Sequence, residues 1–372
     1  MRILSVFGTR PEAIKLAPVI RAFTGRIGVI HASCVTAQHR QMLDQVLDVF
    51  ALRPEFDLDL MTPGQSLEQI TAKAIEGVCR VIDEFNPDWV LVQGDTTTAF
   101  AAALAAFYRK VKVGHIEAGL RTGNINSPWP EEMNRRLIGQ LTTRHYPPTK
   151  TAAENLLSEG VKSENILITG NTVIDALHWI TNRLETDTPL RNAIEAKFGF
   201  LDPAKRLILV TGHRRENLDG GIEQICQALA EIAAGNDVEV IYPVHLNPKV
   251  QSTVRALLAN RPAVHLVEPL DYLPFVYLMK RAHLIVTDSG GVQEEAPSFS
   301  RPVLVTRDTT ERPEAIEAGT ACLVGANAAS IVHHVTRLLK DQRAYAAMAS
   351  ANNPFGDGNA AKLICEDLLS LH

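Results

Sequence analysis

The sequence predicts an α/β protein built from two Rossmann-like, doubly wound domains that face a central cleft. Its 372 residues are more than a single hydrophobic core usually organises. Short apolar runs alternate with segments of helical periodicity, which is typical of parallel sheets with helices on both faces. The runs lie at residues 3–7, 29–35, 89–92 and 113–116, and again at 207–210, 238–242, 264–267, 284–287 and 303–305. Because such sheets bind ligands beyond the carboxyl ends of their strands, we expect the site in that cleft.

A domain boundary is expected where the strand pattern stops, between residues 170 and 207. A helical stretch at 173–184 is followed there by a polar, proline-containing piece at 185–189. We therefore expect an N-terminal domain at 1–169 and a C-terminal domain at 170–357. The amphipathic last segment, about 358–372, should form a helix that crosses back to the first domain.

Composition and charge exclude several classes of function. The net charge of −5 argues against nucleic-acid and membrane partners, although a locally basic cleft can still bind phosphates. The Ala-rich stretch 99–108 is too short to span a bilayer, and the N-terminus lacks the apolar run of a signal peptide. Five widely spaced cysteines form no C-x-x-C pair, which indicates free thiols in a reducing compartment. We expect a soluble, cytoplasmic protein.

The segment after the apolar run 284–287 predicts an anion site. Asp288, Ser289 and the glycines Gly290 and Gly291 lie between that strand and a potential helix. Glycines let the backbone approach a ligand closely, and the first N–H groups of the helix point outward. A helix N-terminus contributes only about 0.3 to 1 kcal/mol toward an anion, whereas a hydrogen bond to a charged group contributes roughly 1.5 to 3. A diphosphate would therefore also need Arg312 or His213.

Three carboxylates are candidates for acid/base chemistry. Asp95 follows the run 89–92, Glu117 follows 113–116, and Glu131 follows Pro130. Other interpretations stay open: Asp95 could cap a helix, Glu131 could serve the dipole of a first helical turn, and His213 could be a core histidine. No dinucleotide, P-loop or zinc-protease motif occurs, so no cofactor and no metal are expected. A diphosphate facing carboxylates suggests a nucleotide sugar.

Several longer blocks together carry a family resemblance. They are FGTRPEAIKLAP from Phe7, TAQHRQMLDQVL from Thr36, GDTTTAF from Gly94, GHIEAGLRTG from Gly114, PWPEEMNRR from Pro128, TGNTVIDAL from Thr169, TGHRREN from Thr211, YPVHLNP from Tyr242 and TDSGGVQEEAPS from Thr287. The chain resembles the non-hydrolysing UDP-N-acetylglucosamine 2-epimerases of bacteria over nearly its whole length. This resemblance implies a fold like that of the two-domain GT-B glycosyltransferases. It also implies interconversion of UDP-GlcNAc and UDP-ManNAc through elimination and re-addition of UDP.

The resemblance also implies roles for individual residues. Acid/base work falls to Asp95, Glu117 and Glu131, with His213 assisting the departing diphosphate. Substrate contacts fall to Arg10, Lys15, Leu270, Phe275, Ser289, Gly290, Gly291, Glu295 and Arg312. Within that set Phe275 would face the uracil and Glu295 the ribose, while Lys15 would support the Arg10 loop or balance charge.

A second UDP-GlcNAc could bind as an activator through Gln38, His39 and Gln41, as in some relatives. The resemblance further implies a homodimer whose product supplies ManNAc units to surface polysaccharides such as enterobacterial common antigen. Two alternative enzymes remain: a hydrolysing relative that releases ManNAc and UDP, and a GT-B glycosyltransferase. A nucleotide-sugar sensor without turnover is the remaining alternative.

Overall fold

The chain divides into two compact units in a computed structural model that describes residues 1–37, 40–62, 64–212, 220–235 and 237–371. The first unit comprises Met1–Trp179 and Phe355–His372, and the second comprises Ile180–Pro354. The division falls inside helix α7 (Thr172–Thr186), so the first ten residues after the predicted boundary at 169 belong to the first compact unit. The predicted domain limits themselves remain a prediction.

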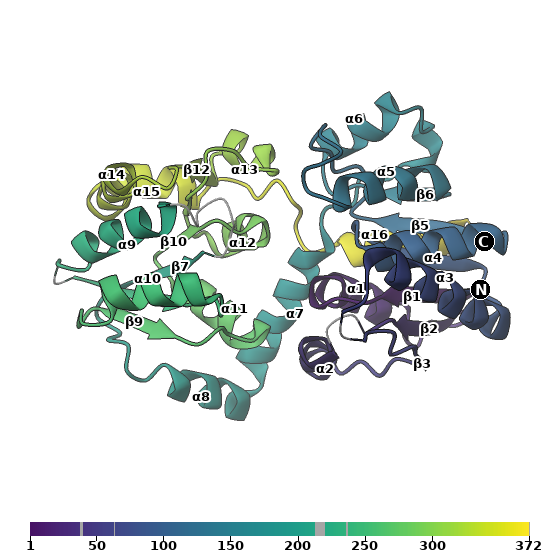
Figure 1. Ribbon diagram of the computed structural model, residues 1–372, viewed down its shortest axis with the longest axis horizontal. Helices are drawn as coiled ribbons and strands as arrows, with labels where there is room; N and C mark the ends of the chain where they lie inside the picture. Colours follow the sequence, from purple (N-terminus) through teal and green to yellow (C-terminus); the bar gives the residue numbers. More distant parts are fainter. Residues whose placement is uncertain (38–39, 63, 213–219, 236, 372) are drawn as a thin grey trace. The chain divides into compact units, whose positions relative to one another are not determined.

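The first unit is a six-stranded parallel sheet flanked by helices (Figure 1). Its strand order is β3-β2-β1-β4-β5-β6, so the order reverses between β1 and β4. The strands are β1 (Arg2–Phe7), β2 (Ile30–Val35), β3 (Phe56–Asp57), β4 (Trp89–Gln93), β5 (Lys112–Ile116) and β6 (Arg144–Tyr146). The helices are α1 (Arg10–Phe23), α2 (Arg40–Val49), α3 (Leu67–Phe85), α4 (Thr97–Tyr108), α5 (Glu131–Leu141), α6 (Lys150–Ser158), η1 (Ser163–Asn165) and α16 (Ala360–Ser370).

The second unit repeats this architecture with the order β12-β11-β10-β7-β8-β9, which reverses between β7 and β10. Its strands are β7 (Arg206–Thr211), β8 (Val238–Pro243), β9 (Val264–Val267), β10 (Leu284–Thr287), β11 (Val303–Val305) and β12 (Ala321–Leu323). Its helices are α8 (Thr188–Lys197), α9 (Gly221–Ile232), α10 (Pro248–Leu258), α11 (Tyr272–Arg281), α12 (Gly290–Glu295), η3 (Ala296–Phe299), α13 (Pro313–Glu317), α14 (Ala328–Lys340) and α15 (Gln342–Ala349).

The two sheets confirm the predicted fold class of two Rossmann-like domains. Three strands escaped prediction: β3, β6 and β12 have only two or three residues each and lie at sheet edges. A run of two or three residues gives little apolar pattern, and β3 and β6 also contain polar residues. The polar piece 185–189 is the end of α7 and the start of α8, separated by Asp187 alone. Asp187 accepts a hydrogen bond from the Leu190 N–H at 3.0 Å and so caps α8.

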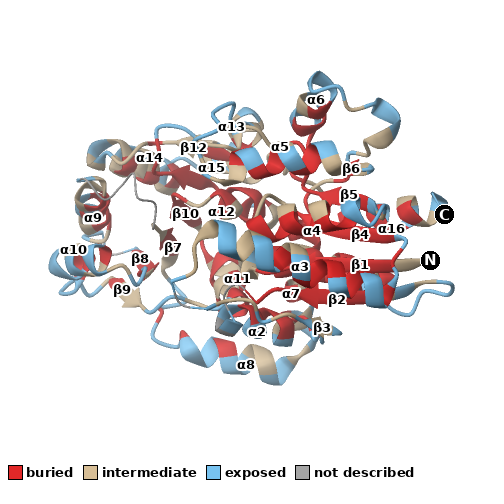
Figure 2. Ribbon diagram, turned by 45° about the vertical axis from the view of Figure 1, so that its right-hand side comes forward, coloured by how far each residue is buried: buried red, intermediate tan, exposed pale blue. Residues whose placement is uncertain are grey.

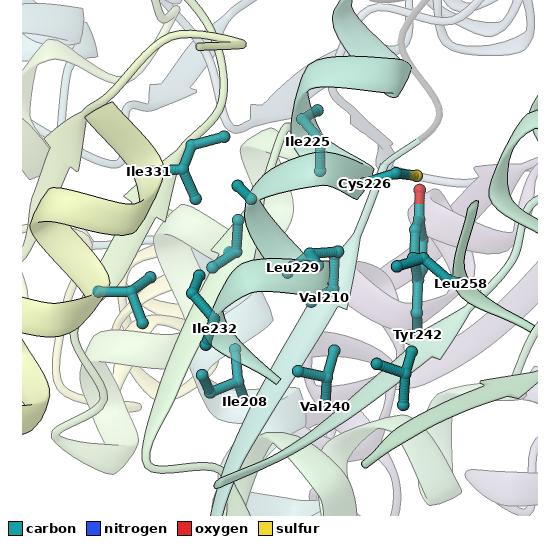
Figure 3. Packing of buried hydrophobic residues seen from close by; sticks show 14 of the residues in the cluster. Ile208, Val210, Ile225, Cys226, Leu229, Ile232, Val240, Tyr242, Leu258 and Ile331 are labelled. Atoms are coloured by element: carbon teal, nitrogen blue, oxygen red, sulfur yellow. The ribbon is translucent and has the colours of Figure 1, made fainter. Parts of the chain in front are cut away.

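Each unit has a hydrophobic core between its sheet and its helices. In the second unit, Ile208 and Val240 of the strands share one core cluster with Ile225, Leu229 and Ile232 of α9, and Ile232 lies beside Ile208 (Figure 3). In the first unit the strands β1, β4 and β5 are largely buried, whereas α3 is exposed along one side (Figure 2). After Thr97 and Thr98, the buried residues of α4 are alanines, which let a helix pack closely onto the sheet.

The C-terminal helix α16 belongs to the first unit. Asp367 of α16 accepts hydrogen bonds from Arg144 at 2.5 and 2.8 Å and from the Tyr146 hydroxyl at 2.9 Å. Asp175 of α7 accepts from the N–H groups of Ala360 and Ala361, the first residues of α16. Burial raises the pKa of Asp175 to about 6. Among the described residues, no helix is long and apolar enough to cross a membrane.

Candidate active site

The strand ends next to the order reversal of the first sheet gather polar residues. Arg10 is the first residue of α1 after β1, Asp95 follows β4, and Glu117 follows β5. Strands β4 and β5 are direct neighbours, with Gln93 paired to Ile116. Asp95 and Glu117 therefore lie at the same edge of the sheet, where doubly wound sheets bind ligands.

Glu117 is the most constrained of the candidate carboxylates. It is 8% exposed and has a positive φ of 62°. Its carboxylate accepts hydrogen bonds from the Lys15 ammonium at 2.5 Å, from the Asn171 amide at 2.9 Å and from the Gln93 amide. These donors from the described residues stabilise the ionised form of the buried carboxylate, and Lys15 balances its charge. Lys15 thus contacts Glu117 directly, and the partners Gln93 and Asn171 were not predicted.

Asp95 belongs to an ion-pair network that includes two residues of α5. Its carboxylate pairs with Arg135, and its carbonyl accepts a hydrogen bond from the Asn134 amide at 3.0 Å. Arg135 also pairs with the fully buried Glu132 at 3.2 Å. Helix α4 is capped by Thr96, whose hydroxyl accepts from the Ala99 N–H at 3.0 Å. Asp95 is therefore not the capping residue of α4.

Glu131 and Glu132 are adjacent but have different surroundings. Glu131 is the first residue of α5 and is half-buried, and its carboxylate makes no hydrogen bond or ion pair with the described part of the chain. Glu132 accepts from the N–H groups of Thr122 and Gly123 and pairs with arginines. Glu132 therefore holds the preceding loop in place.

Glu12 links the turn after β1 to the turn after β4. One carboxylate oxygen accepts from the N–H groups of Gly8 and Thr9 at 3.0 and 2.8 Å, and the other accepts from the Thr96 hydroxyl at 2.6 Å. Burial raises the pKa of Glu12 above its usual value. Through these bonds Glu12 fixes the loop of Arg10 relative to the loop of Asp95, a role that the sequence did not reveal. Arg10 makes no ion pair within the described residues.

The predicted anion turn of the second unit follows β10, next to β7 where that sheet reverses. Ser289 precedes α12, and its N–H donates to the Thr287 hydroxyl at 2.9 Å. Arg312 pairs with Glu294, and its Cζ would lie 3.8 Å from a Cβ added at Gly290. The guanidinium therefore lies beside the glycine turn. His213 follows β7 in sequence and lies outside the described residues.

The remaining candidates are dispersed along the chain. Glu295 is the last residue of α12 and is buried. The burial of Tyr272 and the negative charge of Glu295 both raise the pKa of Tyr272. Leu270 lies just before α11 and Phe275 within it, both half-buried. Of the activator segment, Gln38 and His39 lie outside the described residues, and Gln41 is the second residue of α2.

Two Rossmann-like domains, each with polar residues where its strand order reverses, define a protein of the GT-B-like class. The chain belongs to the UDP-N-acetylglucosamine 2-epimerase family, whose model matches residues 21–369. It is 55% identical to UDP-N-acetylglucosamine 2-epimerase of Escherichia coli (strain K12), with 99% of this chain and 98% of the relative covered.

Solved structures of UDP-GlcNAc 2-epimerases are also similar to this chain over its whole length. UDP-GlcNAc 2-epimerase from Neisseria meningitidis, bound to UDP-GlcNAc, is 50% identical and superimposes with a TM-score of 0.93 over 100% of both chains. UDP-GlcNAc 2-epimerase from Methanocaldococcus jannaschii is 33% identical with a TM-score of 0.86, again over 100% of both chains.

Proposed function

We propose that this chain catalyses the reversible epimerisation of UDP-GlcNAc to UDP-ManNAc at carbon 2 of the sugar, without hydrolysis. Family membership supports the activity, since curated relatives of the same length carry the name UDP-N-acetylglucosamine 2-epimerase. The structural observation that carries the proposal is the pair of carboxylates Asp95 and Glu117, which follow neighbouring strands. Each of them forms an ion pair with a basic side chain. Such fixed carboxylates are suited to proton transfer.

The chemistry of the sugar explains why elimination is needed. Carbon 2 of UDP-GlcNAc is not adjacent to a carbonyl group, so its proton is poorly acidic. When the bond from carbon 1 to the diphosphate breaks, UDP leaves with the electron pair and the ring gains oxocarbenium character. A carboxylate can then remove the carbon-2 proton, which leaves 2-acetamidoglucal. Return of a proton to the opposite face and of UDP to carbon 1 completes the inversion.

The two units would divide this work. In the second unit, Ser289, Gly290, Gly291 and Arg312 would bind the diphosphate, Glu295 the ribose and Phe275 the uracil, with Leu270 beside it. In the first unit, Asp95, Glu117 and Glu131 would transfer protons, with Lys15 balancing the charge of Glu117 and Arg10 contributing a cation to the diphosphate. His213 would assist the departing diphosphate. UDP must stay bound while it is detached from the sugar.

Three further proposals concern the setting of the enzyme. A second UDP-GlcNAc would act as an activator near Gln38, His39 and Gln41. The chain would act as a cytoplasmic homodimer. Its product would supply ManNAc units for surface polysaccharides.

An NMR time course on UDP-GlcNAc in D2O, without acceptor or added cofactor, tests the reaction. We expect UDP-ManNAc to form with deuterium at carbon 2 and UDP to stay near the level of enzyme sites. Formation of UDP-ManNAc without deuterium would contradict elimination. Accumulation of free ManNAc and UDP would indicate a hydrolysing enzyme. Turnover that needs a sugar acceptor would indicate a glycosyltransferase.

A further inference from the structure

Glu117 has a backbone conformation that few non-glycine residues adopt. Its φ of 62° lies in the left-handed region, which costs of the order of 1 kcal/mol unless surrounding contacts hold it. The Glu117 N–H donates to the Tyr146 carbonyl at 3.0 Å and so fixes the peptide. The backbone therefore sets where the side chain leaves the strand end, and the donors around the carboxylate set its final orientation.

These donors divide into one charged group and two neutral amides. Lys15 supplies the positive charge at 2.5 Å from Oε1. Gln93 donates to Oε2, and Asn171 donates to Oε1 at 2.9 Å. The amides add no charge, so their contribution is directional. Asn171 is 2% exposed, which leaves little room for water to replace its amide.

Further hydrogen bonds to the described residues hold Asn171 itself in place. Its N–H donates to the Phe355 carbonyl at 2.7 Å. Its side-chain oxygen accepts from the Val173 N–H at 3.1 Å, at the start of α7. Because a backbone N–H must meet the amide oxygen, this bond assigns the amide orientation and leaves the Nδ2 group to face Glu117. The amide can therefore hold the carboxylate in one orientation.

The position of Asn171 in the chain adds a further constraint. The chain passes from the first unit to the second through α7 and returns at Phe355, and Asn171 contacts both segments. The preceding residue, Gly170, has a φ of 84°, and a Cβ there would lie 3.1 Å from the Gly356 Cα. This tight backbone contact holds the two segments together beside the amide.

We propose that Asn171 is a positioning residue for Glu117, which orients the carboxylate for proton transfer at the sugar while Lys15 keeps it charged. The inference rests on the proposed epimerase function, because it assigns Asn171 a part in that reaction. Asn171 would act on the reaction through Glu117 alone, and the second unit would bind the nucleotide.

The first test replaces Asn171 by Ala and measures UDP-ManNAc formation. Loss of a hydrogen bond to a charged group should lower kcat about 10- to 100-fold, with KM and the Kd for UDP within roughly threefold of the parent values. Thr172→Val is the matched control, because its buried hydroxyl has no hydrogen-bond partner in the described residues. The control should keep the parent kcat. An unchanged kcat in folded N171A would overturn the proposal.

Asn171→Asp provides a test that preserves the side-chain shape and has a readout a merely structural role would not move. At pH 9 two carboxylates repel each other, and the donor to Glu117 is lost. As the pH falls the pair takes up one proton, and the resulting O–H group can donate in place of the amide. The kcat of N171D relative to the parent should therefore rise about tenfold between pH 9 and 6. A ratio that is independent of pH would contradict the assignment.

The parent enzyme separates the two hypotheses. If it fails to make UDP-ManNAc, the proposed function is wrong whatever the variants do. If it is active and both Asn171 variants match it in kcat and pH profile, only the role of Asn171 is wrong. Should N171A fail to fold, as judged by its thermal transition, N171D decides.

Discussion

The two units share one strand order, but the candidate site residues at their strand ends have different surroundings. In the first unit, the candidate carboxylates of Glu117 and Asp95 are paired with the cationic side chains of Lys15 and Arg135. In the second, the candidate site is a turn of Ser289 and two glycines beside Arg312. Neighbouring side chains therefore fix the carboxylates of Asp95 and Glu117, for which we propose proton transfer. The glycine turn of the second unit instead offers the N–H groups of a helix N-terminus to an anion.

Glu117→Gln should have the largest effect, confined to the chemistry of the first unit. The amide cannot take a proton, and its NH2 group would meet the donors Lys15, Gln93 and Asn171. Because acid/base groups contribute about 10²- to 10⁴-fold, kcat should fall by that factor. The affinity for UDP, measured by calorimetry, should stay within roughly threefold.

Glu154→Gln is the matched control for this variant, since Glu154 is an exposed carboxylate on α6. It should leave both kcat and UDP affinity at the parent values. Parent-like turnover by E117Q would remove Glu117 from the catalytic set. Loss of UDP binding by E117Q would show that the first unit also holds the nucleotide.

Gly290→Ala should act on the second unit and change binding more than chemistry. The added methyl would meet Arg312 at 3.8 Å, an ordinary contact, so the unliganded protein should fold normally. The same methyl would obstruct a phosphate approaching the turn. Loss of a hydrogen bond to a charged group predicts a Kd for UDP about 10- to 100-fold weaker by calorimetry.

Gly199→Ala, at a site with ordinary φ where the methyl meets only Ala196 at 3.5 Å, should bind UDP like the parent. If G290A also binds UDP like the parent, the phosphate lies elsewhere. A G290A variant that loses turnover with unchanged affinity would mean that the second unit takes part in the chemistry.

The same contrast shows what the sequence could predict. The apolar runs predicted the two sheets, since buried parallel strands are continuous and apolar. They also placed Asp95, Glu117 and Ser289 at strand ends, because parallel strands force their carboxyl ends to one edge. The edge strand β3 has two residues and no pattern of its own.

The partners of the site residues could not be predicted, because they come from distant parts of the chain. Gln93 is 24 residues from Glu117, and Asn171 is 54 residues away. Arg135 reaches Asp95 across 40 residues. No local periodicity encodes such contacts. The available signal for Asn171 and Arg135 was that each lies in a motif block of the family resemblance. A motif block does not indicate which residues are in contact.

Acid should destabilise the first unit before the second. Burial lowers the pKa of His31 and His115 to about 4, and that of His145 to about 3. All three lie in the first unit, whereas the two histidines of the second unit whose pKa is lowered by burial, His283 and His334, have smaller shifts. Below pH 6.5 the unfolded chain binds protons that these folded imidazoles do not. Their contribution to stability is therefore complete above about pH 6.5 and declines as the pH falls toward 4.

Asp175, also in the first unit, works in the opposite direction. Its raised pKa of about 6 means that protonation between about pH 6 and 4 favours the fold. The raised pKa of Glu12 acts in the same direction, so two carboxyls oppose three imidazoles in this unit. Hydrogen exchange at pH 7 and pH 5, corrected for intrinsic rates, should show protection lost first in β2, β5 and β6. Earlier loss in β7 and β8 of the second unit would contradict the prediction.

Asp367→Asn should have the smallest effect and should separate stability from catalysis within the first unit. Asp367 joins α16 to β6 through Arg144 and Tyr146, away from the proposed proton-transfer residues in sequence. An amide can accept only one of these donors well. The free energy of unfolding should fall by about 2 kcal/mol, which lowers Tm by roughly 4 to 8 °C.

Glu366→Gln, whose partner Lys362 lies 4.0 Å away at the surface, should change neither Tm nor kcat. At 25 °C D367N should keep the parent kcat, because Glu117 retains its donors. A fall in kcat that parallels E117Q would mean that α16 helps to hold the catalytic carboxylates.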